Sequence, residues 1–387
     1  MSEWRKVKFL DLFALPSRNG LTKPSRVRGS GYKMINMGEL FSNGRIYDIP
    51  MELVPLNDKE KEVAKVERYD LLFARQSLVL EGAGKCSIVM DVSDLTTFES
   101  HLIRVRLDYN IANPLFYYYY FSSSLSPISS IVSQCAQAGI KGSDLVQIMV
   151  DFPPLHIQHR IATILSSYDS LIENYQKQIK LLEESAQRLY KEWFIDLRFP
   201  GHENTKIVDG VPEGWEKKKV GNLISKVLRT KQVSANNYLY SGRFPVIDQS
   251  RNYIAGYTND IESLVKVTIP YIVFGDHTRV LKYVPFSFAK GADGTQLIMS
   301  NDLERMPQSL FYNSLIEIDL SNYSYARHFK YLKEESILVP SKDIAQRYDK
   351  VVSQYFQSIQ KNREQIHHLT EARDRLLPKL MSGEIEV

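Results

Sequence analysis

Apolar residues follow a heptad pattern in two separate stretches of the chain. In the first stretch they recur at alternating steps of four and three residues, from Ile161 to Trp193. The members of this seam are Ile161, Leu165, Tyr168, Ile172, Tyr175, Ile179, Leu182, Ala186, Leu189 and Trp193. Such spacing is typical of the a and d positions of a coiled coil. Because residues 155–199 contain no glycine or proline, we predict one uninterrupted helix here.

The second stretch repeats the first one 187 residues later, so that Ile161 corresponds to Tyr348. Its seam consists of Tyr348, Val352, Tyr355, Ile359, Asn362, Ile366, Leu369, Arg373, Leu376 and Leu380. The polar residues Asn362 and Arg373 indicate a surface that specifies register or faces a partner. Three residues that precede each seam also match, namely Pro153 with Pro340, Ile157 with Ile344 and Arg160 with Arg347. The two helices are therefore copies of one element, and we expect Pro378 to end or kink the second copy.

The repeat also includes the segments that precede the helices. Trp4 corresponds to Trp215 at an offset of 211, and residues 32–38 correspond to residues 244–250 at an offset of 212. Residues 69–75 then correspond to residues 270–276 at an offset of 201. Since the offset falls to 187 at the helices, the second copy has shorter loops than the first. One architecture is thus used twice in the chain.

Short apolar runs at 71–74, 86–90 and 101–105 predict strands, and residues 114–121 predict a helix. We therefore predict an α+β fold with two globular domains in tandem. The expected boundaries are 1–152 for the first globular domain, 153–200 for the first helix, 201–339 for a linker and the second globular domain, and 340–387 for the second helix. A pseudo-twofold relation would pair the two helices as an antiparallel coiled coil; the alternative is that each helix folds onto its own domain.

Composition narrows the class of protein without identifying it. The 387 residues are 43% hydrophobic and carry a net charge of only +4, so no segment is a polycation. Nucleic-acid binding would depend on local basic clusters, of which the chain has Arg18, Lys23, Arg26 and Arg28, and then Lys217, Lys218, Lys219, Arg229 and Lys231. Because only Cys86 and Cys135 occur and no apolar run approaches the roughly 20 residues that span a bilayer, we expect a cytoplasmic protein.

Catalytic and metal-binding motifs are incomplete. Residues 151–155 contain an acid and two prolines, as in the base-gripping motif of amino-methyltransferases, but a phenylalanine intrudes and the aromatic is absent. Residues 82–85 end like a phosphate-binding loop but lack its first glycine and its hydroxyl, so a turn is expected. His156 and His159 have no third ligand. The acid, base, hydroxyl and cation of residues 274–279 are adjacent, and neighbouring residues of a strand point to opposite faces. We therefore expect no catalytic residues, no metal and no cofactor.

The architecture resembles the DNA-specificity subunit of type I restriction-modification systems. The resemblance covers essentially the whole chain and rests on two globular segments, each followed by a helix that opens with proline, isoleucine and arginine. The resemblance also rests on three short motifs, at residues 72–77, 211–215 and 274–279. The resemblance implies a non-catalytic subunit whose two target recognition domains each read half of a split sequence in double-stranded DNA. It further implies that the paired helices act as a spacer and dock two methyltransferase subunits, which motor-nuclease restriction subunits join.

Base reading needs arginine for guanine, asparagine or glutamine for adenine, and aspartate for cytosine, while lysine holds phosphates. On this basis the expected DNA-binding residues of the first domain are Lys23, Arg26, Tyr32, Lys33, Asn36, Arg75, Gln76 and Ser77. Those of the second domain are Asp248, Gln249, Ser250, Arg251, Asp276, His277, Thr278 and Arg279. Two alternatives stay open: a self-sufficient DNA methyltransferase or nuclease with degenerate motifs, and a coiled-coil scaffold that binds only proteins.

Overall fold

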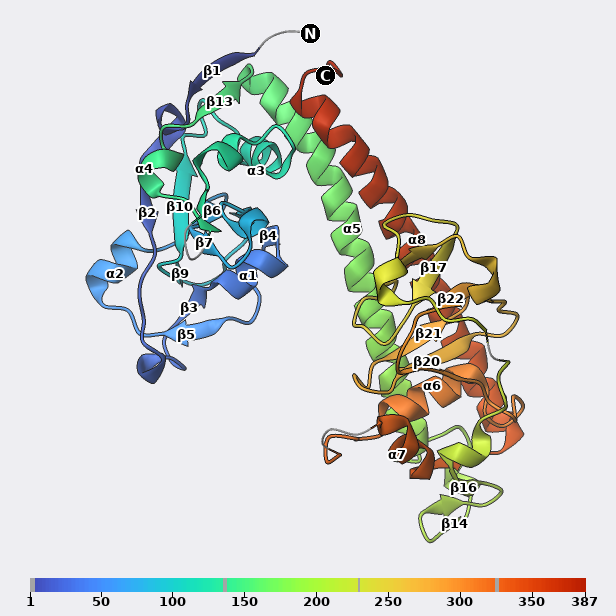
Figure 1. The fold of residues 1–387 in the computed structure, drawn as a ribbon. Helices are drawn as coiled ribbons and strands as arrows, with labels where there is room; N and C mark the ends of the chain where they lie inside the picture. Colours follow the sequence, from blue (N-terminus) through green and yellow to red (C-terminus); the bar gives the residue numbers. More distant parts are fainter. Residues whose placement is uncertain (1–3, 135–137, 229, 324–326) are drawn as a thin grey trace. The chain divides into compact units, whose positions relative to one another are not determined.

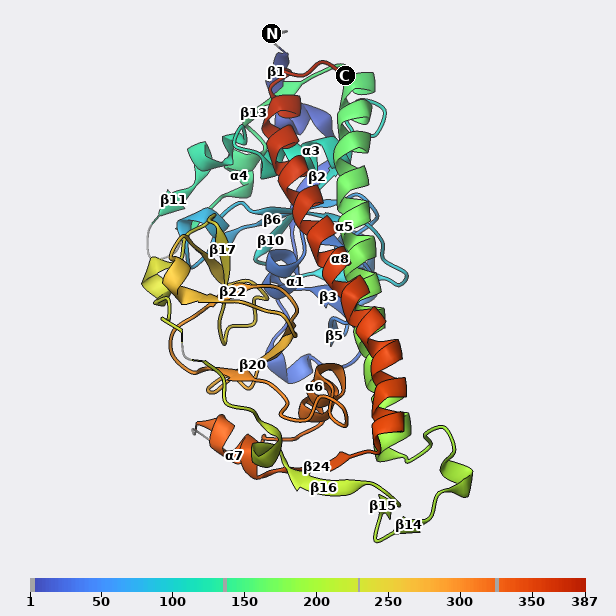
Figure 2. The same cartoon turned by 90° about the vertical axis from the view of Figure 1, so that its right-hand side faces the viewer.

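The computed structural model describes residues 4–134, 138–228, 230–323 and 327–387, which belong to two compact units (Figures 1 and 2). Unit 1 comprises Met1–Glu173 and Ile366–Val387, and unit 2 comprises Asn174–Gln365. Each unit combines helices with β-sheets, which confirms the predicted α+β class. Each unit also contains the beginning of one long helix and the end of the other.

Unit 1 is built on a five-stranded sheet of order β2-β10-β6-β8-β4, a three-stranded sheet of order β5-β3-β9, a three-stranded sheet of order β11-β12-β7, and the pair β1-β13. The strands are β1 (Arg5–Lys8), β2 (Phe13–Asn19), β3 (Tyr32–Ile35), β4 (Arg45–Ile46), β5 (Glu52–Val54), β6 (Leu71–Ala74), β7 (Gln76–Ser77), β8 (Cys86–Val89), β9 (Thr96–Phe98), β10 (Leu102–Leu107), β11 (Ser133–Gln134), β12 (Ala138–Gly139) and β13 (Met149–Phe152). The strands β6, β8 and β10 confirm the three predicted from apolar runs.

The helices of unit 1 surround these sheets. They are α1 (Met37–Ser42), α2 (Asp58–Val63), α3 (Pro114–Ser122), α4 (Gly142–Leu145) and the short 3-10 turns η1 (Phe9–Leu12), η2 (Ser25–Val27), η3 (Leu80–Gly82) and η4 (Pro127–Ile131). The helix predicted at 114–121 is α3. It begins with a proline at its first position, and the Asn113 side chain accepts a hydrogen bond from the Phe116 N–H, two features that favour a helix start.

Unit 2 contains smaller sheets of order β18-β17-β22-β19 and β21-β20-β23, with the pairs β14-β15 and β16-β24. The strands are β14 (Ile207–Val208), β15 (Val211–Pro212), β16 (Glu216–Lys219), β17 (Phe244–Ile247), β18 (Gly256–Thr258), β19 (Leu264–Val265), β20 (Tyr271–Gly275), β21 (Leu281–Val284), β22 (Phe288–Lys290), β23 (Thr295–Ile298) and β24 (Ser336–Val339). The shorter helical elements are the π-helical turn η5 (Lys191–Ile195), the 3-10 turns η6 (His202–Asn204), η7 (Val220–Leu223), η8 (Ala235–Asn237) and η9 (Ile261–Ser263), and the helices α6 (Gln308–Ile316) and α7 (His328–Glu334).

The two units share a topology, as the sequence repeat predicts. In unit 1 the strand after Trp4 pairs antiparallel with the strand before the first long helix, β1 with β13. In unit 2 the strand after Trp215 pairs in the same way with the strand before the second long helix, β16 with β24. The parallel pair β3 and β9 likewise corresponds to the parallel pair β17 and β22. The weak similarity of the two sequences therefore reflects one fold.

The two long helices are α5 (Leu155–Tyr190) and α8 (Lys342–Met381). None of the predicted seam residues is exposed on either helix. In unit 2, Tyr348 bonds to the carbonyl of Ala186, and Asn362 bonds to Gln178, so the position on α5 falls as the position on α8 rises. The two helix segments of unit 2 therefore run antiparallel.

Pro378 does not end α8, which was one of the two expected effects of this proline. Pro378 lies inside the helix, which continues to Met381. A proline removes one backbone hydrogen bond, but only three residues follow it in the helix. Beyond it, the Ser382 N–H donates to the carbonyl of Pro378 at 3.0 Å, and Leu380 and Met381 are buried in the core of unit 1, so the last turn is retained.

The long helices also pack on the globular parts. In unit 1, Ile161 and Leu165 of α5 and Leu380 of α8 belong to one buried cluster together with Phe116 of α3. Figure 1 shows α3 lying between the strands of unit 1 and α5. In unit 2, Ala186 of α5 and Val352 of α8 share a buried cluster with strand β20 and helix α6. Each unit thus has one core to which both long helices contribute.

Candidate nucleic-acid interface

Two segments predicted to bind DNA meet in unit 2. The first follows β17 and contains residues 248–251, and the second follows β20 and contains residues 276–279. The Thr278 hydroxyl donates a hydrogen bond to the carbonyl of Gln249 at 2.6 Å, and the His277 N–H donates to the Gln249 side-chain oxygen at 3.1 Å. The fold therefore joins both segments into one surface, which we call the Gln249 loop cluster.

Small residues allow this close approach. A Cβ on Gly294 would lie 2.7 Å from Cδ2 of His277 and 2.8 Å from Oε1 of Gln249, and Gly294 has a φ of +70°. A Cβ on Gly275 would lie 2.1 Å from the Thr278 hydroxyl. Only glycine fits both the space and, at Gly294, the left-handed backbone.

We expect Gly294→Ala to destabilise unit 2 more than left-handed backbone strain alone would. The matched control is Gly210→Ala, because Gly210 has a φ of +73° and open space around its Cβ position. A Cβ at Gly294 would displace the end of the Gln249 side chain and break its hydrogen bond with the His277 N–H. The free energy of unfolding should therefore fall by about 0.5 to 1.5 kcal/mol more for Gly294→Ala. Chemical denaturation of both variants measures the difference, and equal losses would mean that the Gln249 loop cluster is not tightly packed.

A buried lysine holds the loop of residues 248–252 in place. Lys282 of β21 is 4% exposed, and its ammonium donates to the carbonyls of Asp248, at 2.8 Å, and of Asn252. Burial lowers the pKa of Lys282 to about 8. The Asp248 carboxylate accepts hydrogen bonds from the N–H and hydroxyl of Ser250. Lys282 and Asp248 thus fix the backbone that carries Gln249 and Arg251.

Lys282 was not among the residues predicted from the sequence. The available signal was a single cation inside the apolar strand 281–284, since a buried charge requires polar partners. Those partners are backbone carbonyls from a distant loop, which no local pattern reveals.

Asp276 differs from its neighbours in the cluster. It is buried, its carboxylate accepts a hydrogen bond from the Phe329 N–H at 2.8 Å, and its carbonyl accepts the His328 N–H at 2.9 Å. Its described contacts therefore anchor the start of α7. The side chains of Arg251, His277, Thr278 and Arg279 are exposed. Arg279 has a φ of +61° and donates from Nη1 to the carbonyl of Leu320 at 3.1 Å, which holds its guanidinium near the cluster surface.

In unit 1 the predicted residues lie in two different sheets. Arg75 precedes β7, which contains Gln76 and Ser77, and the Gln76 side-chain oxygen lies 2.9 Å from Nδ1 of His101. Tyr32 and Lys33 belong to β3. His101 was not among the predicted residues, because the sequence pattern placed it inside the strand expected at 101–105 and the structure begins β10 at Leu102.

Several of these side chains in unit 1 have partners within the unit. Lys33 pairs with Asp48, and Lys23 pairs with Glu60 at 2.9 Å. The Asn36 N–H donates to Glu39 at 2.8 Å at the start of α1. Arg26 is exposed. Arg229 and Cys135, which the sequence analysis considered, lie outside the described residues.

Other chemistry sought in the sequence has a structural explanation. Lys85, the last residue of the loop that resembled a phosphate site, donates to the carbonyl of Phe41 at 2.9 Å, and Gly84 has a φ of +75°, so this segment is a turn. Within the part of the chain that the structure describes, no three His, Cys, Asp or Glu residues gather in a way that could hold a metal ion. Over the same residues, no helix combines the length and apolar character needed to cross a membrane.

Comparison with known proteins gives one consistent result. Residues 1–184 match the family model described as the type I restriction modification DNA specificity domain. The MjaIX specificity subunit of Methanocaldococcus jannaschii is 27% identical over 320 residues, which cover 76% of this chain and 73% of that protein. The MjaX specificity subunit of the same organism, a putative type I enzyme by its name, is 25% identical over 100% of this chain and 94% of its own.

A solved structure has the same fold. The S subunit of a type I restriction-modification system from M. genitalium superposes with a TM-score of 0.61 at 17% identity, covering 97% of this chain and 96% of that one. The similarity in sequence extends beyond the matched domain to both units, and the fold is shared over nearly the full length. The chain is therefore similar in sequence and in fold to the DNA-specificity subunits of type I restriction-modification systems.

Proposed function

We propose that this protein is the non-catalytic subunit that recognises a bipartite, asymmetric DNA sequence and directs methyltransferase and restriction subunits to it. The observation that carries the proposal is that one topology occurs twice with different polar loops. Unit 2 presents the Gln249 loop cluster, and unit 1 presents Gln76 beside His101. Two readers with different side chains recognise two different short sequences.

The long helices would act as the spacer between the readers. The antiparallel contacts within unit 2 and the buried seam support a coiled coil with pseudo-twofold symmetry. In this proposal the target recognition domains occupy residues 1–152 and 201–339, and the spacer helices occupy 153–200 and 340–387. Two methyltransferase subunits would dock on the helix pair, and motor-nuclease subunits would join them.

The polar side chains of the two units suggest how bases are read. Arg251 and Arg279 carry the bidentate donors that suit guanine, and Gln249 suits adenine. In unit 1, Arg75 and Gln76 have the same two chemistries. Lys23 and Arg26 would contact phosphates, which position a protein on DNA without reading sequence.

Arg279→Ala is expected to weaken specific binding by about 1 to 3 kcal/mol and to relax base preference in one half-site only, because one bidentate base contact has about that value. Arg347→Ala is the control, since Arg347 is also exposed in unit 2 but pairs with Asp343 on α8. Binding selections on randomised half-sites measure both effects. A change in the half-site read by unit 1 would contradict the modular assignment.

The function itself is tested by methylation. The purified chain, S-adenosylmethionine and DNA should yield no methylation, whereas addition of the partner methyltransferase subunits should yield methylated adenines within one two-part sequence. Methylation by the chain alone would favour the self-sufficient methyltransferase. Unchanged methylation sites in the absence of this chain would favour a scaffold that binds only proteins.

A further inference from the structure

Two ion pairs join α5 to α8, and both have the acid on α5 and the arginine on α8. In unit 1, Nη1 of Arg373 lies 2.6 Å from Oδ1 of Asp169. In unit 2, Nη2 of Arg363 lies 3.0 Å from Oε1 of Glu183. In both of these pairs the acid belongs to α5 and the base to α8.

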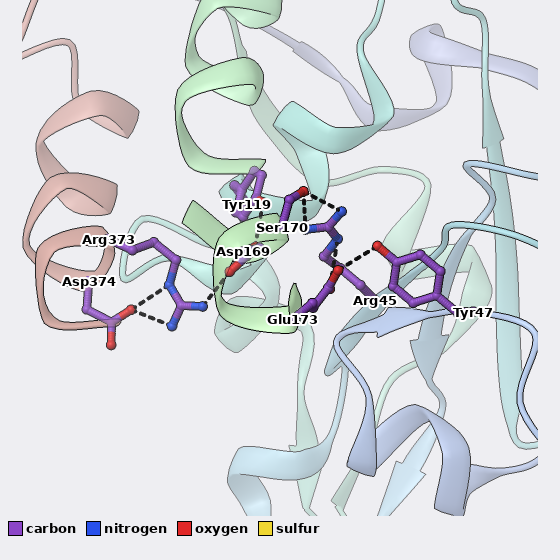
Figure 3. A network of polar contacts seen from close by, with 8 residues as sticks. All are labelled: Arg45, Tyr47, Tyr119, Asp169, Ser170, Glu173, Arg373 and Asp374. Carbon is purple, nitrogen blue, oxygen red and sulfur yellow. Dashed lines mark hydrogen bonds and ion pairs between the residues drawn. The ribbon is translucent and has the colours of Figure 1, made fainter. Parts of the chain in front are cut away.

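The surroundings hold these pairs in place. Figure 3 shows Arg373 reaching from α8 to Asp169 on α5, with Tyr119 of α3 against the same carboxylate. The Asp169 side chain is only 8% exposed and accepts the Tyr119 hydroxyl at 2.5 Å. In unit 2 the Arg363 guanidinium lies 3.7 Å from the centre of the Tyr253 ring. Neither arginine is a freely solvated side chain.

The repeat carries no charge at the equivalent positions. At the offset of 187, Asp169 and Glu183 of α5 correspond to Phe356 and Thr370 of α8, and Arg363 and Arg373 of α8 correspond to Gln176 and Ala186 of α5. In unit 2, Phe356 stacks on Tyr283 with ring centres 4.2 Å apart, and Ala186 is fully buried. Each ion pair thus occurs within one unit, and the positions that correspond to its residues in the repeat are neutral.

We propose that the two ion pairs make α5 select α8 as its partner and reject a second copy of either helix. If α5 paired with α5 of another chain in the same register, Asp169 would face Ala186 and Glu183 would face Gln176, so four acids would lack a cation. If α8 paired with α8, Arg373 would face Phe356 and Arg363 would face Thr370. Charges at the flanks of a coiled coil select partners in this way, by penalising the wrong pair.

The selection of α8 by α5 also affects DNA recognition. This effect, unlike the helix pairing itself, rests on the proposed function. Each globular part is followed by its own long helix, so a homotypic pair would bring together two copies of one reader. The intact chain already contains one reader of each kind, and the heterotypic pair keeps these two readers together. The charge pattern of the helices therefore protects an asymmetric target against exchange of helices between chains.

The test uses the full chain with a protease site inserted at 209–210, between the exposed strand β14 and β15. The folded protein is cut, unfolded in urea and refolded, and native mass spectrometry counts pairs of the two segments. The wild-type segments should refold as heterotypic pairs with an excess of about tenfold or more over homotypic pairs. The neutral variant Asp169→Asn, Glu183→Gln, Arg363→Gln, Arg373→Gln should lose most of that excess.

Two further variants test the proposal in case the variant with four substitutions refolds poorly. Arg363→Glu alone should lower the heterotypic excess, and adding Glu183→Arg should restore it, because the pair is then reversed in sign. The control Glu371→Gln, Arg375→Gln removes an ion pair within α8 and should leave the excess unchanged. Abundant homotypic pairs from the wild type, or an undiminished excess in both the variant with four substitutions and Arg363→Glu, would overturn the proposal.

Discussion

Arg373→Met is expected to lower the free energy of unfolding by about 3 to 5 kcal/mol, because it leaves the Asp169 carboxylate buried without its cation. Asp169 cannot turn to water, since its side chain is 8% exposed and is held by Tyr119. Methionine preserves much of the length of arginine, so the loss reports charge rather than a cavity. Urea unfolding at neutral pH measures the difference.

Two companion variants separate this effect from a general effect of mutating α8. Arg375→Met removes an exposed arginine that pairs with Glu371 on the same helix, and a change within about 0.5 kcal/mol is expected. Asp169→Asn combined with Arg373→Met should recover part of the loss, because the unpaired charge is gone. If Arg373→Met lowers the free energy of unfolding by less than about 1 kcal/mol, the Asp169 carboxylate does not need its ion pair with Arg373.

Insertion of one heptad into each long helix should lengthen the nonspecific DNA spacer by about three base pairs. The insertion points are after Glu173 on α5 and after Gln365 on α8, where unit 1 and unit 2 meet in the sequence. Seven residues add roughly 10 Å of helix, and B-DNA rises about 3.4 Å per base pair. Three base pairs also turn the duplex by roughly a quarter turn or more, so we expect weaker binding with both half-site sequences retained.

The preferred spacing can be measured by selection from a DNA library with random spacers and the assembled methyltransferase complex. A heptad inserted in α5 alone is the control, because it shifts the seam of one helix against the other and should destabilise the protein. An unchanged spacer with tight binding in the double insertion would mean that the helices do not set the distance between the readers.

The repeated fold and the long helices could be predicted because they follow from local periodicity. A seam such as that from Ile161 to Trp193 determines which face of a helix is buried, whatever it packs against. Strands β6, β8 and β10 were equally visible as apolar runs. Offsets between the repeats then indicated which elements correspond.

The loop geometry depends on residues far apart in the sequence and was less predictable. The contact of Thr278 with Gln249 requires β17 and β20 to end side by side, and Lys282 acts through carbonyls some 30 positions away. The burial of Asp276, by contrast, follows from the local pattern of its strand. Asp276 continues the alternation of Ile272 and Phe274, both of which face the core, and so its side chain points inward.

The contribution of α8 to unit 1 affects how the protein can fold during synthesis. Leu380 and Met381 share a buried cluster with Val7 and Phe9, so two segments separated by more than 360 residues of the sequence contact each other. Domains usually complete folding as they leave the ribosome, but the core of unit 1 cannot close until the ribosome has translated almost all of this sequence. Until then its apolar surface is exposed, and a premature stop before α8 would damage the N-terminal reader as well as the C-terminal one.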